Sequence, residues 1–253
     1  MSDHFKLVEH YVSTQGEGPN TGKVTQFVRF AGCDMRCGGW PCDTPFASDP
    51  KQWAKIYYKR TVEELYEDIL NKYRETGALN VCFTGGEPFM QDNDLLCELF
   101  ELMMPTLDWV VNEDGGFTII SKEPEARFLI EAFSNGSFEY PQKALDKVEF
   151  MMDWKLNGSG EGSTSLDNRL LNAKRIYGGI KFVCKDEEDF KQAIEVWNEL
   201  KDVVMPETRF WVGSAWDVFP TSRVVELVLE HKLPWSLNVQ VHNYIFGANV
   251  RGT

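Results

Sequence analysis

Three cysteine residues near the N-terminus have the type and spacing of metal ligands. Cys33, Cys37 and Cys42 are separated by three and then four residues. Thiolate is the ligand that iron–sulfur clusters require, and three thiolates on a four-iron cluster leave one iron free to bind and activate a small molecule. A structural zinc site is the alternative. Such a site normally has four ligands, but no fourth cysteine or histidine lies nearby, and His10 is remote in sequence.

The remaining cysteines are scattered along the chain. Cys82, Cys97 and Cys184 each adjoin an apolar residue, so we expect them to be small buried residues rather than ligands. In a reducing compartment, a tight group of cysteines is more often metal-binding than disulfide-bonded. The sequence therefore predicts one metal centre, on the segment 33–42.

Further candidate residues follow predicted strands. One segment is Thr84-Gly85-Gly86-Glu87-Pro88. Glycines let the backbone approach a ligand closely, and the Glu87 carboxylate can bind an ammonium group. Ser134 and Lys155 come at the ends of two later predicted strands. An ordinary turn at the glycines and a surface lysine at 155 are the alternatives.

Strands alternate with helices along the chain, which is typical of a mostly parallel sheet. The clearest helix covers residues 61–76, where Thr61 and Glu64 form a capping box and Gly77 supplies the stop. Further helices are predicted over 93–104, 187–200 and 221–231. The predicted strands are 5–12, 24–31, 80–84, 128–133, 148–155, 179–184, 208–213 and 236–241. This order predicts an open doubly wound sheet or a partial barrel, with the chemistry at the C-terminal ends of the strands.

The length and composition limit the possibilities further. A chain of 253 residues suits one α/β domain over 1–253, and we expect insertions near 45–60 and 109–121, the second a hairpin around Asp114-Gly115-Gly116. A net charge of −13 disfavours nonspecific binding to nucleic acid or anionic membranes. No apolar run approaches the roughly 20 residues that span a bilayer, and residues 1–6 lack the features of a signal peptide. We therefore expect a cytoplasmic protein.

The cysteine segment resembles the cluster loop of the radical S-adenosylmethionine (SAM) superfamily. The usual spacing there is three and then two residues, so we expect Gly38 and Gly39 to let the extra residues bulge outward. The segments 11–18, 27–33, 42–44 and 240–244 closely resemble the 7-carboxy-7-deazaguanine synthase family. These matches lie near both ends of the chain, with the glycine-glycine-glutamate segment, 134–136 and 180–183 between them in order.

The resemblance implies a modified, incomplete (β/α) barrel and a specific reaction. With a 4Fe-4S cluster, SAM and Mg²⁺, the enzyme would convert 6-carboxy-5,6,7,8-tetrahydropterin to 7-carboxy-7-deazaguanine by hydrogen abstraction, ring contraction and loss of ammonia. An electron donor such as a flavodoxin and a homodimer are also implied. The implied cofactor residues are Gly85, Gly86, Glu87, Ser134 and Lys155, with Thr44 on the magnesium ion. The residues expected to bind the substrate are Gln15, Glu17, Arg29, Gln240 and His242.

The hydrogen-bonding groups of these side chains indicate which part of the substrate each would bind. Gln15 and Glu17 suit the guanidine-like edge of the pterin, and Arg29 and His242 suit its carboxylate. A packed core position for His242 and a simple turn at Thr44, or Asp43 as the true ligand, remain alternatives. Two other functions also stay open: a radical SAM activase that installs a glycyl radical on a partner protein, and a noncatalytic iron–sulfur or zinc protein. Whether the product serves tRNA or DNA modification is left open.

Overall fold

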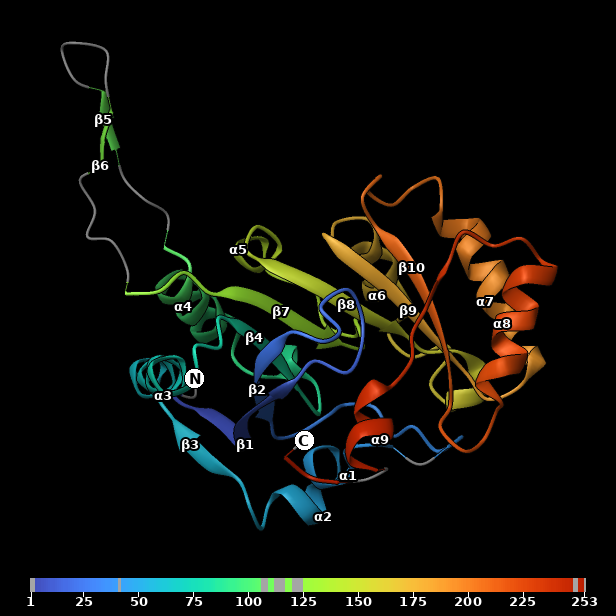
Figure 1. Ribbon diagram of the computed structural model, residues 1–253, viewed down its shortest axis with the longest axis horizontal. Helices are drawn as coiled ribbons and strands as arrows, with labels where there is room; N and C mark the ends of the chain where they lie inside the picture. The colour runs from blue at the N-terminus through green and yellow to red at the C-terminus, as the bar shows by residue number, and fades with distance from the viewer. Residues whose placement is uncertain are drawn as a thin grey trace.

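The computed structural model describes residues 3–40, 42–105, 109–111, 117–119, 125–247 and 250–252 (Figure 1). Within these residues, one sheet contains nine strands in the order β11-β10-β9-β8-β7-β4-β2-β1-β3. Their bounds are β1 Phe5–Thr14, β2 Val24–Phe30, β3 Tyr58–Arg60, β4 Asn80–Gly85, β7 Leu129–Ser134, β8 Val148–Trp154, β9 Gly178–Cys184, β10 Arg209–Ser214 and β11 Ser236–Leu237.

The strands from β2 to β11 run parallel and follow one another in the order of the sequence. Parallel strands joined through helices close progressively into a barrel. Here β1 pairs antiparallel with β2, and β3 pairs antiparallel with β1 at the edge. The sheet does not close on itself. The prediction of a modified, incomplete barrel is therefore confirmed.

The two faces of the sheet differ because side chains alternate along a strand. On β2, Val28 and Phe30 point into the main hydrophobic core, whereas Phe27 and Arg29 line the opposite, concave face. On β9, Ile180 and Phe182 join the same core, and Lys181 between them lies on the concave face. The alternation therefore separates the hydrophobic core, which the helices cover, from the opposite face of the sheet, which can bind a ligand.

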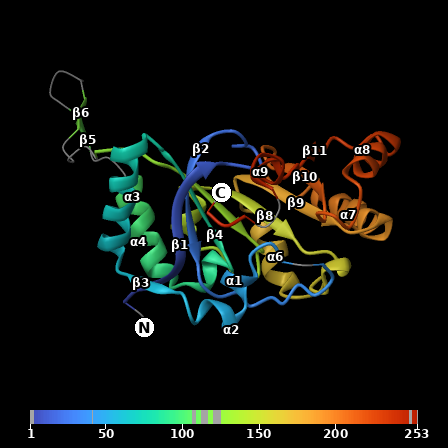
Figure 2. The same cartoon turned by 60° about the horizontal axis from the view of Figure 1, so that its bottom comes forward.

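The helices that pack on the core begin and end at recognisable signals. Helix α3, Val62–Thr76, has the predicted capping box at Thr61 and Glu64 and ends at Gly77 in the left-handed conformation. Figure 2 shows α3 and α4 at one end of the sheet and α7 and α8 at the other. The remaining bounds are α1 Pro45–Ser48, α2 Pro50–Trp53, η1 Pro88–Met90, α4 Asn93–Met103, α5 Gln142–Leu145, η2 Asn157–Ser159, α6 Leu166–Ala173, α7 Glu187–Leu200, α8 Thr221–Glu230 and α9 Val241–Phe246. None of the helices in the described residues is long and apolar enough to cross a membrane.

The structure corrects the predicted strand over 236–241 and shows which elements form in the two predicted insertions. The strand predicted over 236–241 is wrong beyond Leu237, because the chain leaves the sheet after Asn238 and starts α9 at Val241. Residues 45–60 form α1, α2 and strand β3, which pairs with β1. In the predicted hairpin, β5 Trp109–Val111 and β6 Phe117–Ile119 pair antiparallel, and the turn at 114–116 lies outside the described residues.

Candidate active site

A cavity of about 600 Å³ opens at the C-terminal ends of the parallel strands. Its lining includes residues from the ends of β2, β4, β7, β8, β9 and β10 and from the segment that leads into α9. All of the predicted site residues except Glu87 line it: Gln15, Glu17, Arg29, Cys33, Cys37, Cys42, Thr44, Gly85, Gly86, Ser134, Lys155, Gln240 and His242. The fold therefore gathers residues from both ends of the chain around one space.

The three cysteines of the 33–42 segment contribute free, partly exposed thiols to this cavity. Cys33 Sγ lies 3.8 Å from Asn135 Nδ2, and Cys42 Sγ lies 3.7 Å from Ser48 Oγ. Burial raises the pKa of the Cys33 thiol to about 12, a cost that binding to a metal ion reverses, since a coordinating thiol is deprotonated. The donor set therefore fits an iron–sulfur cluster.

No three metal-binding side chains among the described residues are close enough together to hold a single metal ion. A four-iron cluster does not need such a group, because each cysteine binds a different iron. A structural zinc ion normally takes four protein ligands, whereas the segment 33–42 supplies three cysteines, which suits a cluster.

The wide spacing between Cys37 and Cys42 is accommodated by docking onto the chain after β8. The backbone N–H groups of Gly38 and Gly39 donate to Ser159 O at 3.0 and 3.2 Å. A Cβ on Gly39 would lie 1.5 Å from Gly158 O, whereas a Cβ on Gly38 would have room. The expectation that both glycines free the loop to bulge is corrected: Gly39 is needed for a close backbone approach that holds the loop in place.

The paired glycines after β4 serve a similar contact. A Cβ on Gly85 would lie 2.4 Å from Phe30 O, and one on Gly86 would lie 1.8 Å from Gly32 O. The N–H of Glu87 donates to Gly32 O at 2.8 Å, which ties the segment to the start of the cysteine loop. Both glycines line the cavity, so their backbone can also approach a ligand there.

Glu87 is the predicted site residue that lies outside the cavity lining. Its side chain is fully buried. The carboxylate accepts hydrogen bonds from Ser134 Oγ at 2.8 Å, Asn135 N at 2.7 Å and Phe89 N at 3.0 Å. Burial raises the pKa of Glu87 to about 7, although these donors oppose the shift. In this structure Glu87 holds the turn that presents Ser134 and Asn135 to the cavity. Its contact with the methionine ammonium stays a prediction.

At the other end of the cavity, Glu17 carries a carboxylate with several partners. Oε2 accepts from Lys181 Nζ at 2.9 Å and from Asn238 Nδ2 at 3.0 Å, and Oε1 accepts from Gln240 Nε2 at 3.2 Å. Burial alone would raise the pKa of Glu17, but the Lys181 ammonium and these hydrogen bonds lower it to about 2. Glu17 is therefore an ionised, acceptor-only group inside the cavity.

Arg29 and Gln15 are held by the sheet beneath them. Arg29 Nε donates to Glu9 Oε1 at 2.7 Å, and its Nη2 donates to the hydroxyl of Tyr11 at 2.9 Å. Gln15 directs its amide N–H to the buried carboxylate of Glu131, and its carbonyl accepts from the backbone N–H of Glu17 at 3.3 Å. Gln15 therefore fixes the loop that carries Glu17, and its own amide is already engaged.

The remaining predicted residues connect the two ends. Thr44 Oγ1 donates to Gly85 O at 3.1 Å, and Asp43 accepts from Gln240 Nε2 at 3.2 Å. Lys155 Nζ pairs with Asp153 Oδ2 at 2.8 Å, so this lysine faces the cavity rather than the surface. The ring of His242 packs directly over Gly16, where a Cβ would lie 2.2 Å from Nδ1.

The comparisons with known proteins agree with this geometry. A family model described as a 4Fe-4S single cluster domain matches residues 14–111. The 7-carboxy-7-deazaguanine synthase of Clostridium acetobutylicum is 30% identical over 252 residues, which cover 98% of this chain and 99% of that protein. The enzyme of the same name from Leptospira interrogans is 30% identical over 265 residues, covering 97% and 98%. The chain belongs to the 7-carboxy-7-deazaguanine synthase family.

Among solved structures, the crystal structure of QueE from Escherichia coli matches with a TM-score of 0.64 and 21% identity, over 94% of this chain and 95% of that one. At this identity the likeness supports the fold alone. The open nine-stranded sheet is thus the incomplete barrel of a radical SAM enzyme, and membership of the 7-carboxy-7-deazaguanine synthase family identifies the chain as an enzyme.

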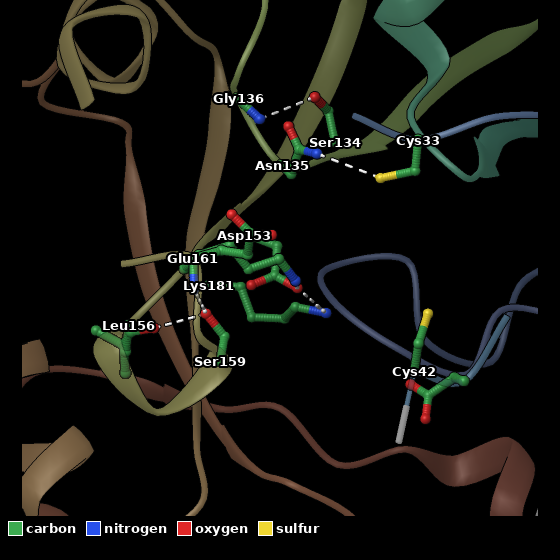
Figure 3. A network of polar contacts seen from close by, with 12 residues as sticks. Cys33, Cys42, Ser134, Asn135, Gly136, Asp153, Leu156, Ser159, Glu161 and Lys181 are labelled. Atoms are coloured by element: carbon green, nitrogen blue, oxygen red, sulfur yellow. Dashed lines mark hydrogen bonds and ion pairs between the residues drawn. The ribbon is translucent and has the colours of Figure 1, made fainter. Parts of the chain in front are cut away.

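Two charged residues that the structure places in the site, Asp153 and Lys181, were not predicted from the sequence. Asp153 accepts from Lys155, and Lys181 lies within 3.7 Å of the same carboxylate (Figure 3). Lys181 is flanked by Ile180 and Phe182 in an otherwise apolar strand. A lysine on a buried strand is rare unless it is paired, so that position carried a usable signal.

Proposed function

We propose that this chain converts 6-carboxy-5,6,7,8-tetrahydropterin to 7-carboxy-7-deazaguanine in the cavity described above. The proposal is supported by one observation in particular. A single cavity is lined by three thiols, which form what we call its cysteine end, and by an ionised carboxylate, a guanidinium and an imidazole. When bound, the 4Fe-4S cluster and SAM supply the 5′-deoxyadenosyl radical that takes a hydrogen atom from the substrate.

The residues at the cysteine end would hold and orient the cofactors. Cys33, Cys37 and Cys42 would each bind one iron. The backbone at Gly85 and Gly86, together with Ser134 and Lys155, would surround the polar groups of SAM, since all four line this part of the cavity. Glu87 would act beneath them by holding Ser134 through a 2.8 Å hydrogen bond.

The residues at the other end would recognise the substrate. The ionised Glu17 can accept hydrogen bonds from the guanidine-like edge of the pterin, and Arg29 and His242 can donate to its carboxylate. Gln240 would position Glu17, to which it donates at 3.2 Å, and Gln15 would fix the loop from below. These contacts would orient the ring and keep water from the reacting carbon.

Magnesium would lie between the two ends. Mg²⁺ prefers octahedral oxygen coordination, with few protein ligands and an anionic substrate group. Thr44 lines the cavity, and its hydroxyl donates to Gly85 O, which leaves its oxygen lone pairs for a cation. The neighbouring carboxylate of Asp43 is the other candidate ligand, so both positions need to be tested.

The basic residues around the segment 45–60 support this part of the surface as the binding site of the electron donor. Residues 50–62 contain Lys51, Lys55, Lys59 and Arg60 but no acidic residue, in a chain whose net charge is −13. The segment starts beside the cluster loop, because Cys42 Sγ lies 3.7 Å from Ser48 Oγ. An acidic carrier such as a flavodoxin would dock here. The variant K51E/K55E should then lose activity driven by flavodoxin but keep activity driven by dithionite.

Two experiments test the proposed reaction. Reduced, cluster-loaded protein incubated with SAM should form 5′-deoxyadenosine, which a noncatalytic iron–sulfur or zinc protein would not do. Adding 6-carboxy-5,6,7,8-tetrahydropterin should then give 7-carboxy-7-deazaguanine, detected by mass spectrometry. Formation of 5′-deoxyadenosine without any conversion of the pterin would instead favour the glycyl-radical activase.

From the family resemblance we also propose a cytoplasmic homodimer. Sedimentation of the purified protein would test its oligomeric state.

A further inference from the structure

Lys181 is a buried cation on the concave face of the sheet. It lies in the middle of β9, and 9% of its side chain is exposed. Its ammonium lies 2.9 Å from Glu17 Oε2 and 3.7 Å from Asp153 Oδ2. Figure 3 shows the Lys181 side chain extended beside Asp153, with Cys33 and Cys42 across the same space. Lys181 thus lies among the residues that line the cavity and directly contacts one of them, Glu17, which would bind the substrate.

The contacts of Glu17 leave room for a ligand on one oxygen. Oε2 accepts two hydrogen bonds, from Lys181 and Asn238, which matches its two lone pairs. Among the described residues, Oε1 accepts one hydrogen bond, from Gln240. The ion pair with Lys181 therefore uses Oε2 and leaves a lone pair of the other oxygen, Oε1, for a ligand.

Without Lys181, the protonation state of Glu17 would change. Burial is the largest influence on this carboxylate and favours the neutral acid, and Lys181 is the largest influence that opposes it. The neighbouring carboxylates Asp43 and Asp153 would also disfavour a negative charge on Glu17. Burial raises the pKa of the Cys82 thiol, which therefore stays neutral and adds no charge. Among the described residues that face Glu17, His242 is the other group that can add positive charge directly, and Lys155 is engaged by Asp153. A neutral Glu17 would present an O–H group where the pterin needs an acceptor.

We propose that Lys181 is a positioning residue that keeps Glu17 ionised and turned toward the cavity, and so determines recognition of the guanidine-like edge of the substrate. This inference rests on the proposed function above. In this proposal Glu17 carries the charge that binds the pterin, and Lys181 maintains it. The two residues are separated by more than half of the chain. Lys181 itself needs no contact with the substrate.

The test measures binding rather than turnover. The probe is 6-carboxypterin, whose fluorescence reports binding to the purified protein. In Lys181→Met, the Kd should rise as the pH falls, by about tenfold for each pH unit below the new pKa of Glu17. The ratio of the variant's Kd to that of the wild type, measured from pH 7.5 to pH 5.5, cancels the titration of groups that Lys181 does not influence. Lys181 also lowers the pKa of Asp153 and Asp43, so the same ratio measured in the Glu17→Gln background gives their contribution. Lys181→Arg should restore the wild-type profile, and Lys191→Met, on the surface of α7, is the matched control.

A second measurement does not depend on the folding of Lys181→Met. In the background of Glu17→Gln, removal of Lys181 should change the Kd less than about twofold, because its partner no longer titrates. A tenfold further loss would show that Lys181 contacts the ligand itself and would overturn the proposal. A Kd ratio that stays constant with pH would also overturn it, while leaving the proposed function intact. Failure of the wild-type protein to bind 6-carboxypterin would overturn the proposed function and this inference with it.

Discussion

At the cysteine end of the cavity, the three cysteines lie partly exposed, and the described polar contacts of the Cys33 and Cys42 sulfur atoms are at 3.7 to 4.0 Å. At the opposite end, Glu17 accepts three hydrogen bonds at 2.9 to 3.2 Å, one of them from a buried ammonium. The first end depends on bound iron to stabilise its thiolates. The second end is neutralised by residues of the chain itself.

This difference has a physical cause. Three thiolates close together repel one another, and only a strongly positive group makes their ionised forms stable in a buried site. A single carboxylate can be stabilised by one lysine and a few amides, all of which the fold can supply. The cysteine end should therefore respond to metal removal, and the Glu17 end to changes in charge and pH.

The largest effect is expected at the cysteine ligands. Replacement of Cys33, Cys37 or Cys42 by alanine should abolish cluster binding, because each thiolate holds a different iron. The iron-to-protein ratio after reconstitution is the measurement. Cys184→Ala is the control, since Cys184 lies fully buried in the core, and it should retain iron with a modest loss of stability. Loss of iron in the control together with retention in Cys42→Ala would contradict the assignment.

Glu87 tests whether a buried carboxylate supports the cysteine end from below. Its pKa is raised from 4.5 to about 7, so the folded protein keeps a proton that the unfolded chain releases near pH 4.5. The free energy of unfolding should therefore fall by about 3 kcal/mol as the pH rises through this interval. Glu87→Gln should remove this part of the pH dependence, measured by urea unfolding at pH 5 and pH 8.

The matched control is Glu139→Gln, at an exposed side chain on the surface, which should keep the wild-type pH dependence. An unchanged slope in Glu87→Gln would mean that Glu87 does not carry the raised pKa. Weaker SAM binding in Glu87→Gln is also expected, because Ser134 and Asn135 would lose their acceptor.

Arg29→Lys tests substrate recognition, because it keeps the positive charge but changes the hydrogen-bonding geometry. Its guanidinium donates to Glu9 and Tyr11 at the same time, which the single ammonium of lysine cannot reproduce in a fixed plane. Arg29→Lys should lower kcat/KM for the pterin by about tenfold or more, the loss of one charge-assisted hydrogen bond. Cleavage of SAM without substrate conversion should persist. Arg74→Lys, at an exposed ion pair with Glu125, is the control, and equal turnover in both variants would remove Arg29 from the site.

The smallest effect is expected at Thr44, which lies between the two ends. If its hydroxyl binds Mg²⁺, Thr44→Ala should shift the magnesium titration of activity several-fold to higher metal concentration, because one of the few protein ligands is lost. Cluster content and SAM binding should not change. Asp43→Asn separates the two candidates, and a wild-type magnesium response in Thr44→Ala would leave the hydroxyl with only its 3.1 Å contact to Gly85 O.

Local patterns in the sequence were sufficient for much of the fold. The alternation of strands and helices predicted the parallel sheet, and Thr61, Glu64 and Gly77 marked the ends of α3 because capping depends on neighbouring residues. The cysteine spacing likewise indicated an iron–sulfur site, because all three thiols come from one short segment of the chain. The end of the last strand was predicted wrongly, since the departure of the chain after Asn238 depends on contacts with distant loops.

The roles of Glu87 and Lys181 were decided by tertiary structure. Glu87 follows two glycines in a motif that suggests contact with a ligand, and in the structure its buried carboxylate accepts hydrogen bonds from Ser134 and Asn135, which come from a strand end 47 residues later. Lys181 becomes part of the site only because β9 faces the loop that carries Glu17, 164 residues earlier in the chain. Alternation along a strand indicates which residues share a face, but the partner across that face depends on the closure of the whole sheet.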